Sequence, residues 1–185
     1  MTTSSNLREL AVQGLTASGA TAAGPNVYSP RTWAMWDQTY PVLLVQTPDE
    51  NGTGWGPNGP PAFTVTTTVR VTARAQNAAL EGDAAAAEVE EQLETMREQI
   101  KAALINYPPI MGLLSQYPSF RSTIQVPRDG QSPIGELVLE IDMEHVQGPE
   151  AFFLATTVAL DEVDITVQMP NGTTDPGLTI ELPQS

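Results

Sequence analysis

The sequence predicts an α/β protein of the α+β type: a mixed, mostly antiparallel sheet packed by a long amphipathic helix and a short N-terminal helix, with a β-rich C-terminal arm. Two patterns indicate this fold class. Apolar residues alternate from Phe63 to Ala73 and again over residues 136–146, which is typical of strands with one buried face. Over residues 83–106 apolar residues recur at helical spacing, so this segment can cover that face.

The N-terminal part should begin with a short helix over residues 7–18, where Asn6 and Glu9 have the spacing of a capping box. A connector rich in Gly, Ala and Pro follows over residues 19–39. We then expect a strand at residues 40–47. Its apolar run is short and rich in branched side chains, which favours a strand buried on both faces.

Residues 48–61 contain four Gly and four Pro. This composition opposes regular structure and predicts a long mobile loop. Trp55 is the only large apolar residue within it. Since aromatic residues are enriched at the centres of protein interfaces, we expect Trp55 to contact a partner.

The helix over residues 83–106 should begin at Asp83 as N-cap and should pack on the strand that precedes it. Its apolar stripe consists of Val89, Leu93, Met96, Ile100 and Leu104. The strand residues expected beneath this stripe are Val65, Val69 and Val71.

The second half of the chain predicts a strand at residues 120–126, a turn at 128–133 and a strand at 136–146. Beyond these, two short β pieces around residues 161–164 and a last strand near the C-terminus are expected. We therefore divide the chain into an α/β domain, residues 1–154, and the C-terminal arm, residues 155–185.

The charge balance is strongly acidic, with 22 Asp and Glu against 8 Lys and Arg and a formal net charge of −14. Such a charge disfavours binding to nucleic-acid phosphates or to anionic membranes. The chain has no Cys, which excludes thiol nucleophiles and thiolate metal sites. There is no signal-peptide pattern and no apolar run long enough for a bilayer, so we expect a soluble protein made in the cytosol.

No pattern in the sequence predicts catalysis, a cofactor or a metal. The single His, His145, falls on the apolar side of a predicted strand, where a core role is the commoner one. No phosphate-binding loop, dinucleotide fingerprint or nucleophile turn is present. We therefore expect a protein that is not an enzyme.

An acidic stripe, Glu140, Asp142 and Glu144, occupies the other side of the same strand. It has the donor type of a metal or general-acid cluster, but without accompanying ligands we expect it to pair with Arg70 and Arg74 on the neighbouring strand. The residues considered for contacts between subunits are Trp55, Arg70, Arg74, Arg121, Arg128, Glu140, Asp142 and Glu144.

Over about residues 5–150 the chain resembles the tail terminator family (tail-completion, minor tail protein U-like) of long-tailed phages and related gene transfer agents. The residues that carry the resemblance are the connector at 21–28 with Arg31-Thr32-Trp33, the strand at 40–45, the long strand at 63–74 and helix at 83–106, and the segment 132–141. No single motif is diagnostic of the family, and the resemblance rests on the order of the elements.

The resemblance implies a structural virion protein of the tail, assembled in the host cytoplasm. It implies a homohexameric ring that caps the head-proximal end of the tail tube, ends tube polymerisation and offers the head–tail joining surface to a head-completion or connector protein. DNA would pass through the channel without specific binding. The residues leave two alternatives open: another tail or head–tail connector component, and a small-ligand-binding domain or enzyme.

Overall fold

A computed structural model describes residues 2–17, 19–29, 40–57, 59–77, 82–127, 134–152, 162–168 and 174–181. The chain forms two compact units, Met1–Phe152 and Phe153–Ser185. Within the described residues, no helix is long and apolar enough to cross a membrane.

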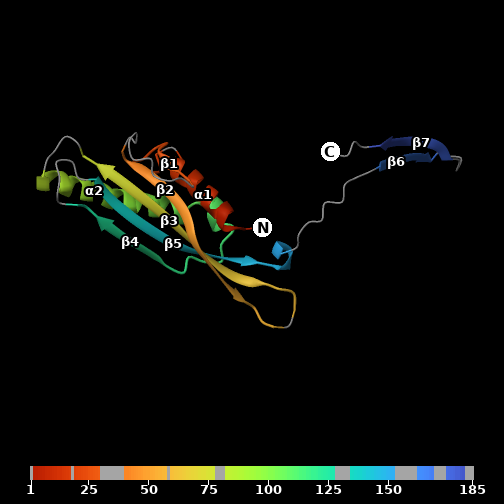
Figure 1. The fold of residues 1–185 in the computed structure, drawn as a ribbon, viewed down its shortest axis with the longest axis horizontal. Helices are drawn as coiled ribbons and strands as arrows, with labels where there is room; N and C mark the ends of the chain where they lie inside the picture. Colours follow the sequence, from red (N-terminus) through yellow and green to blue (C-terminus); the bar gives the residue numbers. More distant parts are fainter. Residues whose placement is uncertain are drawn as a thin grey trace. The chain divides into compact units, whose positions relative to one another are not determined.

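The first unit is built on a five-stranded sheet with the strand order β1-β2-β3-β5-β4 (Figure 1). The strands are β1 (Val27–Tyr28), β2 (Val42–Gly54), β3 (Phe63–Gln76), β4 (Phe120–Gln125) and β5 (Ile134–Gln147). β1 runs parallel to β2, and all other neighbours are antiparallel. This confirms the predicted α+β class with its mixed, mostly antiparallel sheet.

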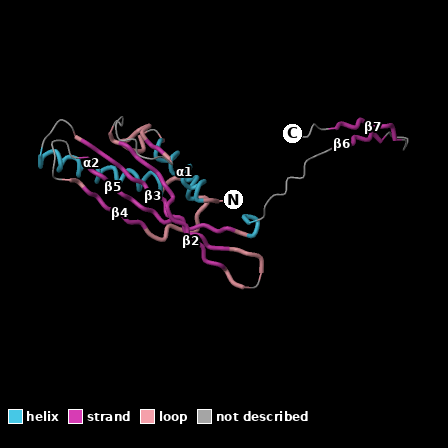
Figure 2. The backbone as a smooth tube through the Cα atoms, viewed as in Figure 1, coloured by secondary structure: helices cyan, strands magenta, loops and turns pink. Residues whose placement is uncertain are grey.

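The helices of this unit pack on one face of the sheet (Figure 2). They are α1 (Ser4–Thr16), α2 (Gly82–Ile105) and the short α3 (Pro108–Met111), and a 3-10 turn, Pro149–Phe152, ends the unit. α1 lies mainly over β2 and β1, whereas α2 lies over β5, β3 and β4. The prolines at the first two positions of α3 separate it from α2, as expected from their missing N–H groups.

The core forms where the apolar stripe of α2 meets the sheet. All five predicted stripe residues are buried, and they share one cluster with Val69 and Val71 of β3. The alternation in β5 is also confirmed, because Leu137, Leu139 and Ile141 are fully buried in the same cluster. The prediction for Val65 was wrong in part: Val65 is buried but lies outside this cluster.

The start of α1 differs from the prediction. The helix begins at Ser4 and not at Leu7, because the N-cap is Thr3, whose Oγ1 accepts a hydrogen bond of 3.1 Å from the backbone N–H of Asn6. Asn6 therefore lies in the first turn. Both residue types cap helices well, so sequence alone did not distinguish them. α2 likewise begins one residue early, at Gly82, so Asp83 lies inside it.

The predicted loop at residues 48–61 was wrong for its first half. β2 continues to Gly54 and pairs with β3 as far as Phe63, with a register shift between Gln46 and Asp49. Pro48 falls within that shift, where a residue without an N–H is tolerated. The connection between the strands is therefore much shorter than predicted, and it begins at Trp55, whose N–H donates to the Ala62 carbonyl at 3.1 Å.

The second unit contains β6 (Glu162–Gln168) and β7 (Thr174–Glu181), paired antiparallel. A β-rich arm was expected here, but its details differ. One strand spans Asp164, where two short pieces were predicted, and the last strand starts at Thr174. Local sequence patterns place strand ends poorly, because pairing with a neighbour decides where a strand stops.

Candidate interaction face

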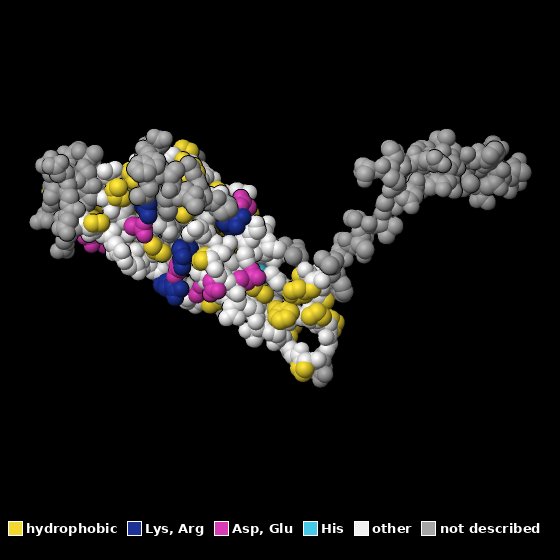
Figure 3. All heavy atoms as spheres, viewed as in Figure 1, with side chains coloured by type: hydrophobic (Ala, Val, Ile, Leu, Met, Phe, Trp, Pro, Cys, Tyr) yellow, Lys and Arg dark blue, Asp and Glu magenta, His cyan; other side chains and the backbone are white. Residues whose placement is uncertain are grey.

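Among the described residues, no helix packs on the face of the sheet opposite α1 and α2, and over β3 and β5 this face carries mostly polar side chains (Figure 3). Strand alternation places these residues opposite the core residues of β3 and β5. β3 contributes Thr64, Thr66, Thr68, Arg70, Thr72 and Arg74. β5 contributes Glu136, Val138, Glu140, Asp142, Glu144 and Val146, and β4 adds Arg121. We call this set the open face.

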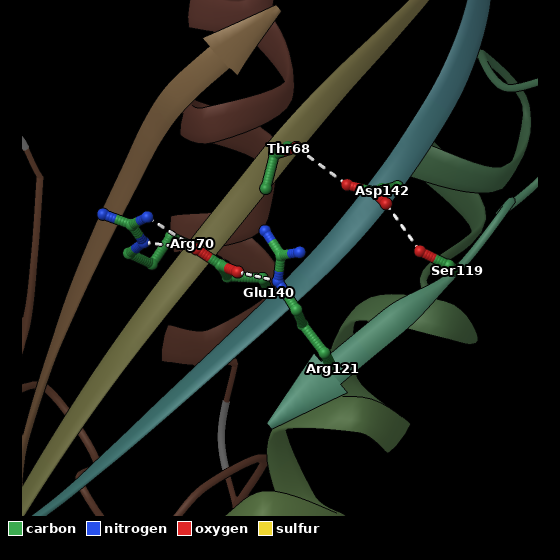
Figure 4. A network of polar contacts seen from close by, with 6 residues as sticks. All are labelled: Thr68, Arg70, Ser119, Arg121, Glu140 and Asp142. Carbon is green, nitrogen blue, oxygen red and sulfur yellow. Dashed lines mark hydrogen bonds and ion pairs between the residues drawn. The ribbon is translucent and has the colours of Figure 1, made fainter. Parts of the chain in front are cut away.

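The centre of the open face is a row of three charged residues on three strands (Figure 4). Arg70 of β3 donates from Nε to Oε1 of Glu140 on β5 at 2.7 Å, with Nη2 at 2.6 Å from the same oxygen. Arg121 of β4 donates from Nε to the other oxygen, Oε2. The register explains the row, because Glu140 lies opposite Arg70 on one side and Arg121 on the other.

This pairing sets the charge of the row. The hydrogen bond from Arg121 lowers the pKa of Glu140, and it outweighs the opposing effect of burial; Arg70 acts in the same direction. The same contact raises the pKa of Arg121. Glu140 is therefore a fixed carboxylate at neutral pH, with both oxygens occupied. The predicted pairing with Arg70 is confirmed for Glu140 alone among the three stripe residues.

The next two carboxylates of the stripe bind neutral side chains. Asp142 accepts hydrogen bonds from Thr68 Oγ1 at 2.7 Å and from Ser119 Oγ at 2.6 Å. Glu144 accepts one from Gln116 Nε2 at 3.1 Å. Backbone hydrogen bonds join the same positions. The N–H groups of Asp142 and Glu144 donate to the carbonyl oxygens of Ser119 and Gln116, which lie in the segment before β4.

Arg74 does not join the acidic stripe, contrary to the prediction. It donates to Glu136 Oε2 at 2.7 Å, because the antiparallel register sets these two residues opposite each other. Ser119 and Gln116 were missed as partners, and no sequence pattern marks them. Arg128, another predicted interface residue, lies outside the described residues.

The end of the β2–β3 hairpin, residues 49–66, projects past the helices (Figure 1). Trp55 is 65% exposed at this end, and its indole N–H donates to Thr64 Oγ1 at 2.9 Å. Val146 of β5 and Phe152 of the 3-10 turn are also exposed, and Phe152 meets Phe63 edge to face at 5.4 Å between ring centres. The hairpin end therefore presents an apolar patch, some distance along the sheet from the charged row (Figure 3).

His145 lies on the core side of β5, as predicted, opposite Val65 of β3. Its side chain is fully buried; Nε2 lies 3.4 Å from Nε2 of Gln147, and Nδ1 has no hydrogen-bond partner among the described residues. Burial lowers the pKa of His145 and outweighs the attraction of Glu50. His145 is thus buried on the core side of β5 but is not a member of the hydrophobic cluster.

An open cleft of about 740 Å³ at one end of the sheet mixes the charged groups of Arg74, Glu90 and Glu136 with apolar residues. Within the described residues, no group of three or more His, Asp or Glu side chains could hold a metal ion. The open face is distinguished by charged side chains that hydrogen bonds between neighbouring strands already hold in place.

A scan against protein-family models and a search of curated proteins found no match to this chain.

Proposed function

We propose that this chain is a structural virion protein that forms a ring on the head-proximal end of a phage tail tube. The ring ends tube polymerisation and provides the surface for joining the head. Its partners are further copies of the chain, the tube protein and a head-completion or connector protein.

The observation that carries the proposal is the open face. An antiparallel sheet can leave one face to water, so exposure alone decides nothing. Here, however, Glu140, Asp142 and Glu144 are each held by neighbouring side chains. Side chains that are already ordered lose little entropy on binding, so such a surface suits protein recognition. The exposed Trp55 at the hairpin end supplies an apolar anchor beside it.

A ring explains how one small chain can do this task. Contacts between two different surfaces of the same protein close into a ring when the rotation between copies is right. One rim then meets the tube and the other meets the head. A net charge of −14 per copy repels DNA phosphates, so DNA can pass through the channel without specific binding.

The test is to add purified protein to growing tail tubes and to examine their ends by electron microscopy. We expect a ring at one end only and an arrest of elongation at that end. Elongation that continues unchanged, with no density added at either end, would overturn the proposal.

A further inference from the structure

The attachment of α1 to the sheet changes character along the helix. Leu7, Ala11 and Leu15 are fully buried in the hydrophobic cluster. The turn before them begins with Ser4, whose hydroxyl lies 3.3 Å from the Thr67 hydroxyl on β3. Thr67 is fully buried but is not part of the cluster. The first turn of α1 is therefore held by polar contacts, and the rest of the helix is held by apolar packing.

The segment that precedes α1 also contacts the sheet. The Thr2 carbonyl oxygen accepts a hydrogen bond of 3.4 Å from the side-chain amide of Gln147 on β5. The same amide nitrogen lies 3.4 Å from Nε2 of His145, two residues earlier on the strand. Hydrogen bonds of this length are weak, because the usual N–H···O distance is about 2.9–3.0 Å. The N-terminal segment thus contacts β5 through a group that also contacts the imidazole.

The site of His145 suits a neutral ring and opposes a charged one. The side chain is fully buried, and Nδ1 has no hydrogen-bond partner among the described residues. The hydrogen bond to the Thr2 carbonyl requires the Gln147 amide to present its N–H side, which is a donor, to this region. A protonated imidazole carries a donor on both nitrogens, so its Nε2–H would face another donor. A buried charge without acceptors is costly, and water can supply them only if the site opens.

The charged groups on the elements around the ring do not remove this cost. Glu50 on β2 attracts the charged ring, and β3 presents only uncharged residues at the core-side positions opposite it. On α1, Arg8 and Glu9 pair with each other, and Glu150 lies exposed in the turn after β5. Burial lowers the pKa of His145 more than the attraction of Glu50 raises it, so the folded chain favours the neutral ring.

We propose that His145 is a pH-sensitive latch for the N-terminal turn of α1. While the ring is neutral, the segment from Thr2 to Ser4 stays bound to the sheet. When the ring takes up a proton, the Gln147 amide turns its oxygen toward the new donor or moves away from it, and in both cases its hydrogen bond to Thr2 is lost. The segment then lifts and water reaches the ring, while the buried residues further along α1 keep the helix in place. This device is independent of ring assembly.

The direction of the pH dependence follows from the two states of the latch. In the open state the ring is in water and has its ordinary pKa of 6.5, whereas burial lowers its pKa in the closed state. The open state therefore binds the proton more tightly, so protons favour opening. The latch should stay closed above about pH 6.5, and the open fraction should rise by up to about tenfold between about pH 7.5 and pH 5.5.

Hydrogen exchange of the full chain, followed by mass spectrometry and corrected for the effect of pH on the exchange chemistry, tests the latch. Peptides covering residues 4–10 should lose up to about tenfold of their protection between about pH 7.5 and pH 5.5. Peptides from α2, residues 93–104, should keep theirs. His145→Gln and His145→Leu both remove the titrating ring and should abolish the change. Glu9→Gln removes an exposed carboxylate from the same helix and should preserve it.

Three results would overturn the latch. The first is equal protection of residues 4–10 at both pH values in the wild-type chain. The second is an equal loss of protection in α2, because the whole domain would then be unfolding. The third is a loss that persists in a folded His145 variant, as verified by far-ultraviolet circular dichroism. The first two comparisons use the wild-type chain alone, so they decide the matter even if neither variant folds.

Discussion

At the scale of single residues, Leu93 tests the core. It is fully buried in the cluster that joins α2 to the sheet. Leu93→Ala should lower the free energy of unfolding by about 2–5 kcal/mol, because it removes buried methyl groups and leaves a cavity. Chemical denaturation measures this. The neighbouring Gln92 is exposed, so Gln92→Ala should change the value by less than about 0.5 kcal/mol. A similar small change for Leu93→Ala would contradict the packing.

His145 makes stability depend on pH. Because its pKa is lowered below 6.5 in the folded state, the unfolded chain takes up the proton first as the pH falls. The free energy of unfolding should therefore be fully retained above about pH 6.5 and should decline below it. Glu140, whose pKa is also lowered, adds a further decline below about pH 4.5.

The control for this profile is His145→Gln, which has no titrating ring. Its free energy of unfolding should stay flat between about pH 8 and pH 5, apart from a uniform offset. If the wild-type and variant profiles have the same shape over that interval, His145 is not the group responsible.

Sequence predicted correctly which face of the sheet a residue occupies where apolar and polar residues alternate along a single strand. The alternation in β5 placed Glu140 and His145 on opposite faces, and both assignments hold. The partners of those residues were harder to predict. Whether Arg74 meets Glu140 or Glu136 depends on the register between strands, and the contact from Arg121 depends on where β4 docks. Neither the register between the strands nor the position of β4 can be read from the sequence around these residues.

At the scale of elements, Gly14 explains how α1 and α2 approach each other. A Cβ placed there would lie 3.1 Å from the Ala103 carbonyl oxygen and 3.3 Å from the Tyr107 ring. Glycine inside a helix costs about 1 kcal/mol relative to alanine, so the sequence pattern alone makes Gly14 look unfavourable. The close packing of α1 against α2 explains why a glycine occupies this position.

Gly14→Ala should lower the melting temperature despite its better helix propensity, because a backbone carbonyl cannot move aside cheaply. Differential scanning calorimetry measures the shift. Gln13→Ala, at the adjacent exposed position, serves as control and should change little. A higher melting temperature for Gly14→Ala would show that the two helices can separate without loss.

The hairpin end can be tested through Trp55. Because Trp55 is 65% exposed, Trp55→Ala should leave the free energy of unfolding within about 0.5 kcal/mol of the wild type. If the residue anchors a partner, the same change should raise the dissociation constant of the oligomer about fivefold or more. Met111→Ala removes an exposed apolar side chain elsewhere and should do neither. If the wild type, Trp55→Ala and Met111→Ala all had the same oligomer dissociation constant, Trp55 would not be part of the interface.

The hairpin also shows where reasoning from local composition fails. Gly52 and Gly54 lie opposite Val65 and Phe63, and the Phe63 ring passes 3.6 Å from where a Cβ would stand at either glycine. A neighbouring strand supplies the hydrogen bonds and the apolar cover that these glycines lack. Such support comes from outside the segment, so composition predicted a loop where the structure has a strand.

At the scale of the whole molecule, charge opposes assembly. Each copy carries a formal −14, and bringing several copies together concentrates that charge. The Debye length shortens from about 30 Å at 0.01 M salt to about 8 Å at 0.15 M, which weakens this long-range repulsion. Ion pairs in direct contact are screened much less. Assembly should therefore be weakest at low salt and should increase toward 0.15 M.

Sedimentation velocity across a salt series, with and without tail tubes, tests this account most directly. We predict monomers in dilute protein at about 0.01 M salt, and either a discrete ring-sized species or binding to tube ends at about 0.15 M. A monomer at every salt and protein concentration, together with no binding to tubes, would contradict the ring-forming role.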